Sequence, residues 1–228
     1  MLINILSTIL ATLAALLPIA NPLFAVTILP GLTSHLSDDE RRRQVKRACY
    51  YMAGILITFL LAGALIMDFF SISIPGLRMA GGLVVAYIGF TMLFPNDAAG
   101  LTDTAHAEAL AKRDISFTPL AMPSLSGPGS IAVVISLSSS VHSHMSGLPV
   151  WLGYIAVSTG IIITAWLSWL ALRASTRLYH FLGENGITAI SRIMGFLLIC
   201  IGVQFLINGT SELLHDPTFM PKAAQSSP

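Results

Sequence analysis

The sequence predicts an all-α membrane protein with six transmembrane helices, and two observations support this prediction. Hydrophobic residues make up 54% of the 228 residues and charged residues only 10%, about half or less of the charged share of a soluble domain. A soluble domain of this size would leave too much apolar surface in water. The apolar residues also fall into six runs of about the 20 residues that a helix needs to cross a bilayer. None of the runs alternates polar with apolar residues as membrane β-strands do.

The connectors between the six runs differ in length and polarity. In chain order they cover residues 2–32, 48–70, 72–94, 115–140, 148–172 and 187–208. Almost no connector separates the second run from the third, so these two helices should form a tight hairpin. Residues 95–114 are polar and are expected to be a cytoplasmic linker, and residues 173–186 form a polar or amphipathic stretch. Residues 211–228 are expected to be a disordered tail.

The basic residues predict how the protein lies in the membrane. Connectors after the first, third and fifth runs hold nine Lys or Arg residues, against two on the opposite side, Arg78 and Lys222. Because Lys and Arg collect in cytoplasmic loops, both termini are expected on the outer side of the membrane. Ser37 and Glu40 fit a capping box that starts a basic helix, whose charged face is expected to contact anionic membrane lipid. We interpret this basic segment as a topology signal rather than a binding site. The nine basic residues are Arg41, Arg42, Arg43, Lys46, Arg47, Lys112, Arg113, Arg173 and Arg177.

The two halves of the chain share a pattern that predicts an internal repeat. Each half, residues 1–94 and 115–210, has three crossings, so the second half enters from the opposite side and the repeats are inverted. Inverted repeats with paired broken helices are typical of transporters, whose binding site lies between the halves. Chance similarity between apolar segments is the alternative. The matching residues are Arg78 with Arg192, Gly81 with Gly195, and the interrupting prolines Pro18 and Pro22 with Pro123 and Pro128.

The first run is long enough to require a break. As one helix its roughly 30 residues would extend about 45 Å, which is more than the hydrocarbon core. Asn21 is a good helix N-cap and Pro22 suits the first helical position. The preceding turn should end near Pro18, because proline lacks a backbone donor. A second half-helix is therefore expected to begin at Asn21 and Pro22, deep in the membrane.

The fourth run repeats this arrangement around Pro128. Either Ser126 or Gly127 can cap a half-helix that starts there. Two half-helices would then direct their N-termini inward from the two halves, each with free N–H groups and about half a positive charge. Together they could hold an anionic or strongly polar solute; the alternative is two structural kinks satisfied by neighbouring helices. The expected solute-binding residues are Asn21, Pro22, Ser124, Ser126, Gly127, Pro128, Gly129 and Ser130.

Other residues within the runs have structural or functional interpretations. Asp68 is expected to pair with Arg78 at the hairpin rather than to relay protons. Gln204 and Asn208 lie four residues apart and share a helix face, where they either bond across helices or line a pathway. Glycines of the third run should let helices pack closely, and a glycine face allows a homo-oligomer without requiring one. These glycines are Gly81, Gly82 and Gly89.

Composition and motifs leave two classes of function. A net charge of +1 gives no field that would attract nucleic acid. The chain has no HExxH or GxSxG motif and no carboxylate cluster within the runs, so we expect no enzyme activity, catalytic residue, metal or cofactor. It also has no P-loop, so ATP is not expected to drive it. The first hypothesis is a transporter or exporter of a small polar or anionic solute, and the alternative is a non-transporting accessory or signalling protein.

Four stretches resemble the hallmark motifs of the MarC family of bacterial inner-membrane proteins. They are residues 17–23 (LPIANPL), 72–82 (ISIPGLRMAGG), 119–124 (PLAMPS) with 127–129 (GPG), and 189–198 (AISRIMGFLL). The resemblance covers nearly all six runs and implies a multi-pass protein of the bacterial inner membrane. The family is grouped with amino-acid exporters of the LysE type, which implies small-solute transport by analogy alone. Its name refers to antibiotic resistance but does not establish drug export, and it supplies no catalytic residues.

Overall fold

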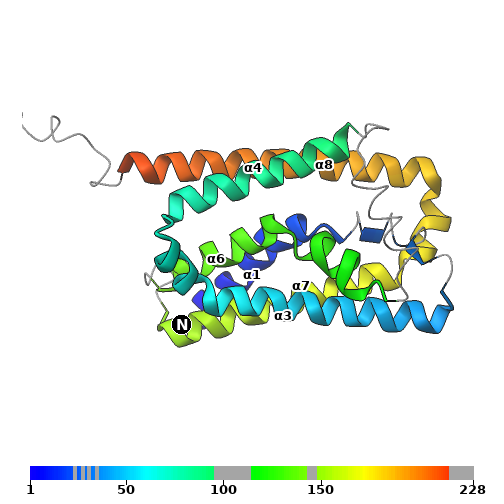
Figure 1. Cartoon of the computed structure of the whole chain (residues 1–228), viewed down its shortest axis with the longest axis horizontal. Coiled ribbons are helices and arrows are strands. Elements are labelled where there is room, and N and C mark those ends of the chain that lie inside the picture. The colour runs from blue at the N-terminus through cyan, green and yellow to red at the C-terminus, as the bar shows by residue number, and fades with distance from the viewer. Residues whose placement is uncertain are drawn as a thin grey trace, which may run out of the picture.

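The protein is all-helical in every part of the chain that the structure describes (Figure 1). The computed structural model describes residues 1–22, 25–26, 29, 32–33, 36–94, 114–142 and 148–215. Within these ranges it has no strand. The helices are α1 (Leu2–Ala20), α3 (Asp38–Phe70), α4 (Ile74–Leu93), the π-helical segment η1 (Ser116–Leu125), α6 (Pro128–His142), α7 (Val150–Arg173) and α8 (Ser175–His215).

Five of the described helices are long and apolar enough to cross a membrane. They are α1, α3, α4, α7 and the part of α8 from Thr188 to Leu214, whereas α6 is apolar but shorter. Large apolar side chains point away from the protein on these helices, as Leu65 (71% exposed) and Leu83 (59%) illustrate. Such an exposed apolar surface is stable in lipid and not in water. The prediction of an all-α membrane protein is therefore confirmed.

The helices form three layers (Figure 1). α4 and α8 lie side by side on one side of the molecule, α3 and α7 lie on the other, and α1 and α6 lie between them. Most of α6 is buried, and it packs against α1, α3, α4 and α7. The core that joins the layers includes Leu16 of α1, Val85 of α4 and Val134 of α6. The middle layer, where both expected helix breaks lie, is therefore covered by protein.

The hairpin between α3 and α4 and the cap of α3 match the sequence prediction. The Ser37 hydroxyl accepts a hydrogen bond from the Glu40 N–H (3.3 Å), and the Glu40 carboxylate accepts one from the Ser37 N–H (3.2 Å). α3 ends at Phe70, and the next residue, Ser71, caps it in a left-handed conformation (φ 53°). The Ser73 hydroxyl then caps α4 by accepting from the Gly76 N–H (3.2 Å). Three residues thus reverse the chain between two long helices.

Glycines bring α4 and α8 into backbone contact. A Cβ atom added to Gly89 would lie 2.5 Å from the Gly195 carbonyl oxygen, and one added to Gly82 would lie 2.7 Å from that of Gly202. The pairings 82–202 and 89–195 fit two antiparallel helices. The expected packing role of Gly82 and Gly89 is confirmed, and Gly81 faces Ala132 of α6 instead. We call this contact the glycine seam.

Three boundaries differ from the sequence prediction. α1 continues through Pro18 and ends at Ala20. α8 begins at Ser175, so the connector expected at residues 173–186 is mostly helical, with a kink at Gly183 (φ 65°). α8 also runs to His215, beyond the expected end of the second repeat. Residues 95–113 of the expected linker and residues 216–228 of the expected tail lie outside the described residues.

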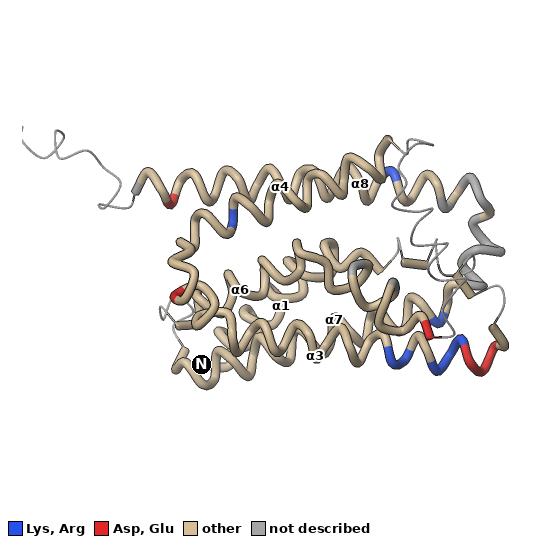
Figure 2. The backbone as a smooth tube through the Cα atoms, in the orientation of Figure 1, with Lys and Arg blue, Asp and Glu red and all other residues tan. Residues whose placement is uncertain are grey.

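Lys and Arg residues gather at the end of the molecule opposite the N-terminus (Figure 2). The first turns of α3 supply five of them, and α7 ends at Arg173. The N-terminus and the end of α8 lie at the other end (Figure 1). The two ends of the helix bundle therefore differ strongly in charge.

The glycine seam predicts a specific difference between two alanine substitutions. Gly89→Ala should lower the free energy of unfolding by about 1–3 kcal/mol, because the new methyl group overlaps a backbone oxygen that cannot move aside. Gly54→Ala has no atom within 4 Å of the new Cβ, so it should be neutral or should stabilise α3 by up to about 1 kcal/mol. Denaturant unfolding in detergent micelles measures both, and equal effects would contradict the seam.

Candidate functional site

The first helix break lies at Asn21, as the sequence predicts. The Asn21 N–H closes α1 by donating to the Leu17 carbonyl (3.2 Å), and its own carbonyl accepts from the Ala25 N–H (3.3 Å). Asn21 adopts a left-handed conformation (φ 40°, ψ 59°), which asparagine tolerates better than most residues. It therefore ends one helix and starts the next turn at Pro22. Its buried side-chain amide donates to the Met92 sulfur of α4 (3.1 Å).

The second break lies between η1 and α6. Thr118 and Met122 have extended backbone angles inside η1, so this segment is not a regular helix. The Gly127 carbonyl accepts from the Ile131 N–H (3.1 Å), which makes Gly127 the N-cap of α6 and places Pro128 at its first position. Of the two caps that the sequence left open, the structure has Gly127.

Ser126, the residue before this cap, has a buried polar group without a partner. Its side-chain oxygen makes no hydrogen bond among the residues that the structure describes, and the residue is 0% exposed. The Ser130 hydroxyl is buried too, and donates to the Leu125 carbonyl over 3.5 Å. N–H groups in the first turn of a helix have no acceptor within it, which applies here to Gly129 and Ser130. The Ser126 hydroxyl thus lies next to the start of α6 in the chain, at the end of the helix that carries these N–H groups.

The two breaks meet through packed aliphatic side chains. A Cβ added to Gly129 would lie 2.6 Å from a Val85 methyl group and 3.2 Å from an Ile19 methyl group. Ile19 precedes Asn21 by two residues, so the start of α6 lies against the end of α1. We call Ile19, Val85 and Gly129 the aliphatic layer. Pro128, in contrast, is exposed, and Ser124 is half-buried.

A cavity of about 220 Å³ lies on the side of this layer toward the termini. None of the eight expected solute-binding residues lines it. The part of its wall nearest the aliphatic layer includes Ala15, Gly81 and Ala132. These residues precede Ile19 and Val85 by four positions and follow Gly129 by three, which is one helical turn in each case. The cavity therefore ends about one turn from the aliphatic layer. Its polar wall is formed by Arg78, Ser136, Ser140 and Asn208.

Arg78 joins three helices at the mouth of this cavity. Its Nε donates to the Ser136 hydroxyl (2.9 Å) and one terminal nitrogen donates to that of Ser140 (3.5 Å), both on α6. Its other terminal nitrogen pairs with the Glu212 carboxylate of α8. The expected pair with Asp68 is wrong, because Arg78 points toward α6 and α8 while Asp68 is exposed at the end of α3.

Glu212 was missed because it falls in the segment that the sequence assigned to the tail. A signal was available, since Gln204, Asn208 and Glu212 recur every four residues on one helix face. The Gln204 amide donates to the Asn208 side-chain oxygen (2.9 Å) within α8. Gln204 and Asn208 therefore bond to each other, and Asn208 also lines the cavity.

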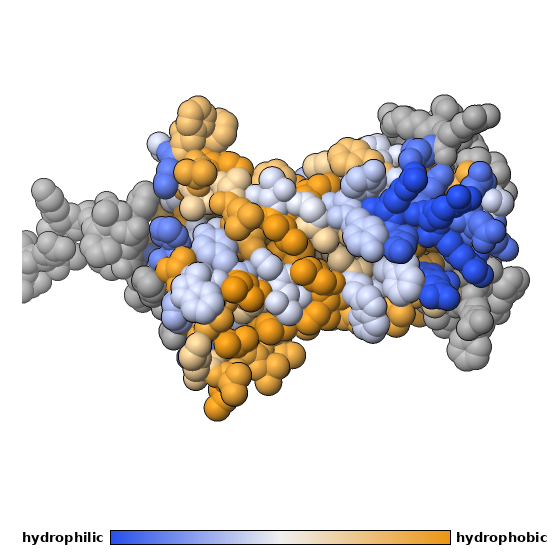
Figure 3. Space-filling model, turned by 90° about the horizontal axis from the view of Figure 1, so that it is seen from below, coloured by the Kyte–Doolittle hydropathy of each residue, from blue (hydrophilic) through white to orange (hydrophobic). Residues whose placement is uncertain are grey.

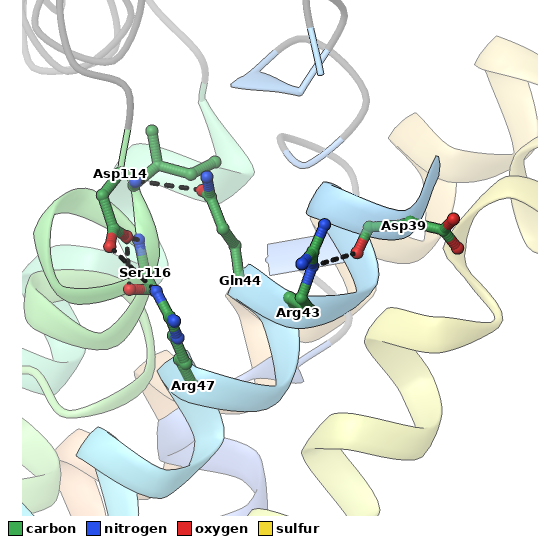
Figure 4. Close-up of polar contacts among 7 residues, drawn as sticks. Asp39, Arg43, Gln44, Arg47, Asp114 and Ser116 are labelled. Atoms are coloured by element: carbon green, nitrogen blue, oxygen red, sulfur yellow. Dashed lines mark hydrogen bonds and ion pairs between the residues drawn. The ribbon is translucent and has the colours of Figure 1, made fainter. Parts of the chain in front are cut away.

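A second polar group joins α3 to η1 at the basic end (Figure 4). The buried Gln44 side chain accepts from the Ile115 N–H (3.0 Å), and Arg47 pairs with Asp114 (3.5 Å). The Ser116 hydroxyl and N–H both donate to the Asp114 carboxylate. These hydrogen bonds, with a smaller effect of Arg47, hold the pKa of Asp114 below its usual value. The start of η1 is thus attached to the basic helix.

The Arg78 pairing predicts a coupling that can be measured. Arg78→Met leaves the Glu212 carboxylate partly buried and unpaired, so it should cost about 1–3 kcal/mol of unfolding free energy. Glu212→Gln in the same protein should then cost less than it does alone, with a coupling of about 0.5–3 kcal/mol. Asp68→Asn is the control and should stay within about 0.5 kcal/mol. Additive effects of the first two substitutions would refute the pair.

Comparison with known proteins identifies the family. Residues 6–214 match the family described as MarC family integral membrane protein. The inner membrane protein MarC of Salmonella typhimurium is 45% identical over 207 residues, which is 89% of this chain and 93% of that protein. The MarC proteins of Escherichia coli strain SMS-3-5 and Citrobacter koseri are 45% and 44% identical, and each match also covers 89% of this chain and 93% of the relative. No solved structure matches. Because the match runs from α1 to α8, through both breaks and the cavity, this chain belongs to the MarC family of integral inner-membrane proteins.

Proposed function

We propose that this protein is a transporter that exports a small polar or anionic solute through its middle layer. In this proposal the chain crosses the membrane six times, as two inverted repeats of three helices. α1 and the turn that follows Asn21 form the first crossing, and η1 with α6 forms the fourth. The antiparallel contact of α4 with α8 supports the arrangement, because the third helices of two inverted repeats must run in opposite directions.

The proposed orientation places the basic end in the cytoplasm and both termini outside. The segregation of Lys and Arg at one end of the bundle supports it (Figure 2), since basic residues are retained on the cytoplasmic side during insertion. The cavity at Arg78 then opens toward the periplasm. The Asp114 and Gln44 contacts lie on the cytoplasmic side.

The unpartnered Ser126 hydroxyl is the observation on which the proposed binding site depends. A buried hydroxyl without a hydrogen bond costs about 1–3 kcal/mol. Next to it, the start of α6 presents the N–H groups of Gly129 and Ser130 and about half a positive charge. A carboxylate, a phosphate or a strongly polar group is the ligand that such a helix end prefers. Asn21 and Pro22 of the other break would complete the site.

The aliphatic layer explains how a site at the breaks could be closed to the outside. The Arg78 cavity ends about one helical turn from Ile19, Val85 and Gly129. A small displacement of α4 relative to α1 and α6 would join the cavity to the breaks. In an inverted-repeat transporter such a displacement is a rocking of one half against the other.

Substitutions in the aliphatic layer test the transport route. Gly129→Ala places a methyl group 2.6 Å from Val85, so flux should fall at least about tenfold in proteoliposomes, in line with the large rate losses caused by small misplacements. Adding Val85→Ala removes the overlapping methyl group and should restore most of the flux. Gly54→Ala is the matched control, and should leave flux unchanged.

The flux assay uses vesicles loaded in turn with radiolabelled small carboxylates, phosphate and neutral polar solutes. Release that depends on the protein, falls in Gly129→Ala and returns in the double variant supports transport through this layer. Unchanged release in Gly129→Ala would show that the solute does not pass through the aliphatic layer. Absence of release for every solute favours the accessory or signalling function.

Ser126→Ala distinguishes a binding hydroxyl from a structural one. If the hydroxyl serves the solute, its removal should leave the unfolding free energy unchanged or raise it by up to about 1 kcal/mol, because a buried unpaired group is lost. The solute concentration for half-maximal flux should rise about five- to tenfold. A loss of stability with unchanged transport would show that the hydroxyl has a structural partner.

A further inference from the structure

A second, larger cavity lies at the basic end, between the start of α3 and the end of α7. It has a volume of about 770 Å³, within the roughly 300–1,000 Å³ range of sites that hold small organic ligands. Four cations of α3 and one of α7 line it, and they are Arg41, Arg42, Arg43, Lys46 and Arg173. The cavity takes no part in the proposed transport site, since it is lined by none of the residues of either break.

Acids among the described residues near this cavity do not neutralise its charge. Arg41 pairs with Asp38 (3.1 Å). Arg43 donates to the backbone oxygen of Asp39 (3.4 Å) rather than to its carboxylate (Figure 4). Even if all three acids in the first turn of α3 are subtracted from the five cations, two positive charges remain. A ligand with one or two negative charges would balance this excess.

The rest of the cavity wall is apolar and aromatic. Leu170 and Leu172 line it together with Trp169, over which the Arg173 guanidinium stacks at 5.3 Å. Lys46 lies over the exposed ring of Tyr50 at 5.8 Å. Tryptophan and tyrosine beside basic residues are typical of the level where hydrocarbon meets headgroups. Figure 3 shows the hydrophilic patch directly adjoining the apolar middle of the molecule.

We propose that this cavity binds the headgroup of an anionic phospholipid. The phosphate would lie among the α3 cations and Arg173, and an acyl chain would descend along Leu170. A free phosphate would satisfy the cations but would leave the apolar wall unused. Basic pockets between helices on the cytoplasmic side are known sites for anionic headgroups, and a lipid with two phosphates would use more of the five cations than a lipid with one.

Tryptophan quenching can report on this site directly. The chain has three tryptophans, so Trp151→Phe and Trp166→Phe leave Trp169, which lines the cavity, as the sole tryptophan to be excited selectively. The full-length protein in detergent is titrated with phosphatidylglycerol, cardiolipin or phosphatidylcholine, each with brominated acyl chains. The two anionic lipids should quench Trp169 saturably, with cardiolipin the tighter, and phosphatidylcholine should quench only weakly and without saturation.

Charge substitutions distinguish binding in this cavity from general attraction of anionic lipid to basic residues. Arg42→Gln should weaken the anionic lipid about fivefold, and Arg42→Gln with Lys46→Gln about 25-fold, at roughly fivefold per cation. Arg192→Gln removes the same charge from an exposed residue of α8 that does not line the cavity, and should change the Kd less than twofold. Arg173→Lys keeps the charge and should retain most of the binding.

Three results would overturn the proposal. Equal quenching by phosphatidylcholine would show that the wall contacts lipid without recognising charge. An equal loss of affinity in Arg192→Gln would show that total charge, not this cavity, attracts the lipid. Displacement of the lipid by millimolar inorganic pyrophosphate would identify a simple anion site.

Discussion

Hydrocarbon offers no hydrogen bonds, and this constraint determines where the helices of this protein can be interrupted. A backbone group left unpaired in lipid costs several kcal/mol, so irregular backbone at membrane depth must be covered by protein or line a cavity. Both interruptions lie in the middle layer, between α4 with α8 and α3 with α7. The apolar spans of the outer helices, which in α8 begin after the kink at Gly183, are regular and expose apolar side chains. The regular outer helices thus shield the irregular backbone from lipid, which avoids the cost of unpaired backbone groups in hydrocarbon.

Inside the bundle, glycines determine how closely the helices approach one another. Gly89 and Gly195 let α4 and α8 touch along their backbones, and Gly129 lets the start of α6 reach Val85 and Ile19. The same property that allows dense packing also makes each position sensitive to a single methyl group. Arg78 and Glu212 add one polar connection among α4, α6 and α8 at the end of the bundle that holds the N-terminus. Packing and this ion pair together hold the cavity in shape.

Much of the fold could be predicted because it depends on local rules. Apolar length marks the spans, and the Ser37 capping box marks the start of α3 to the residue. The breaks at Asn21 and Gly127 follow from proline and glycine chemistry. The structure places the helix interruptions where the sequence expects them, while the role of the eight residues in binding stays a prediction.

The parts that could not be predicted depend on contacts between distant segments. The sequence predicted Asp68 as the partner of Arg78, and the packing of α4 on α8 brings Glu212 to it instead. The attachment of η1 to α3 through Gln44 and Asp114 likewise joins segments about 70 residues apart. No local pattern encodes either contact. The aliphatic layer was also unforeseen, because it combines single residues from three helices.

The glycine seam has a mechanical consequence. α4 and α8 meet backbone to backbone at Gly82 with Gly202 and at Gly89 with Gly195, and tightly packed interiors transmit strain. The two helices should therefore move together as one rigid body. A displacement of α4 at Arg78 would therefore also move Val85, which lies about two turns further along the same helix.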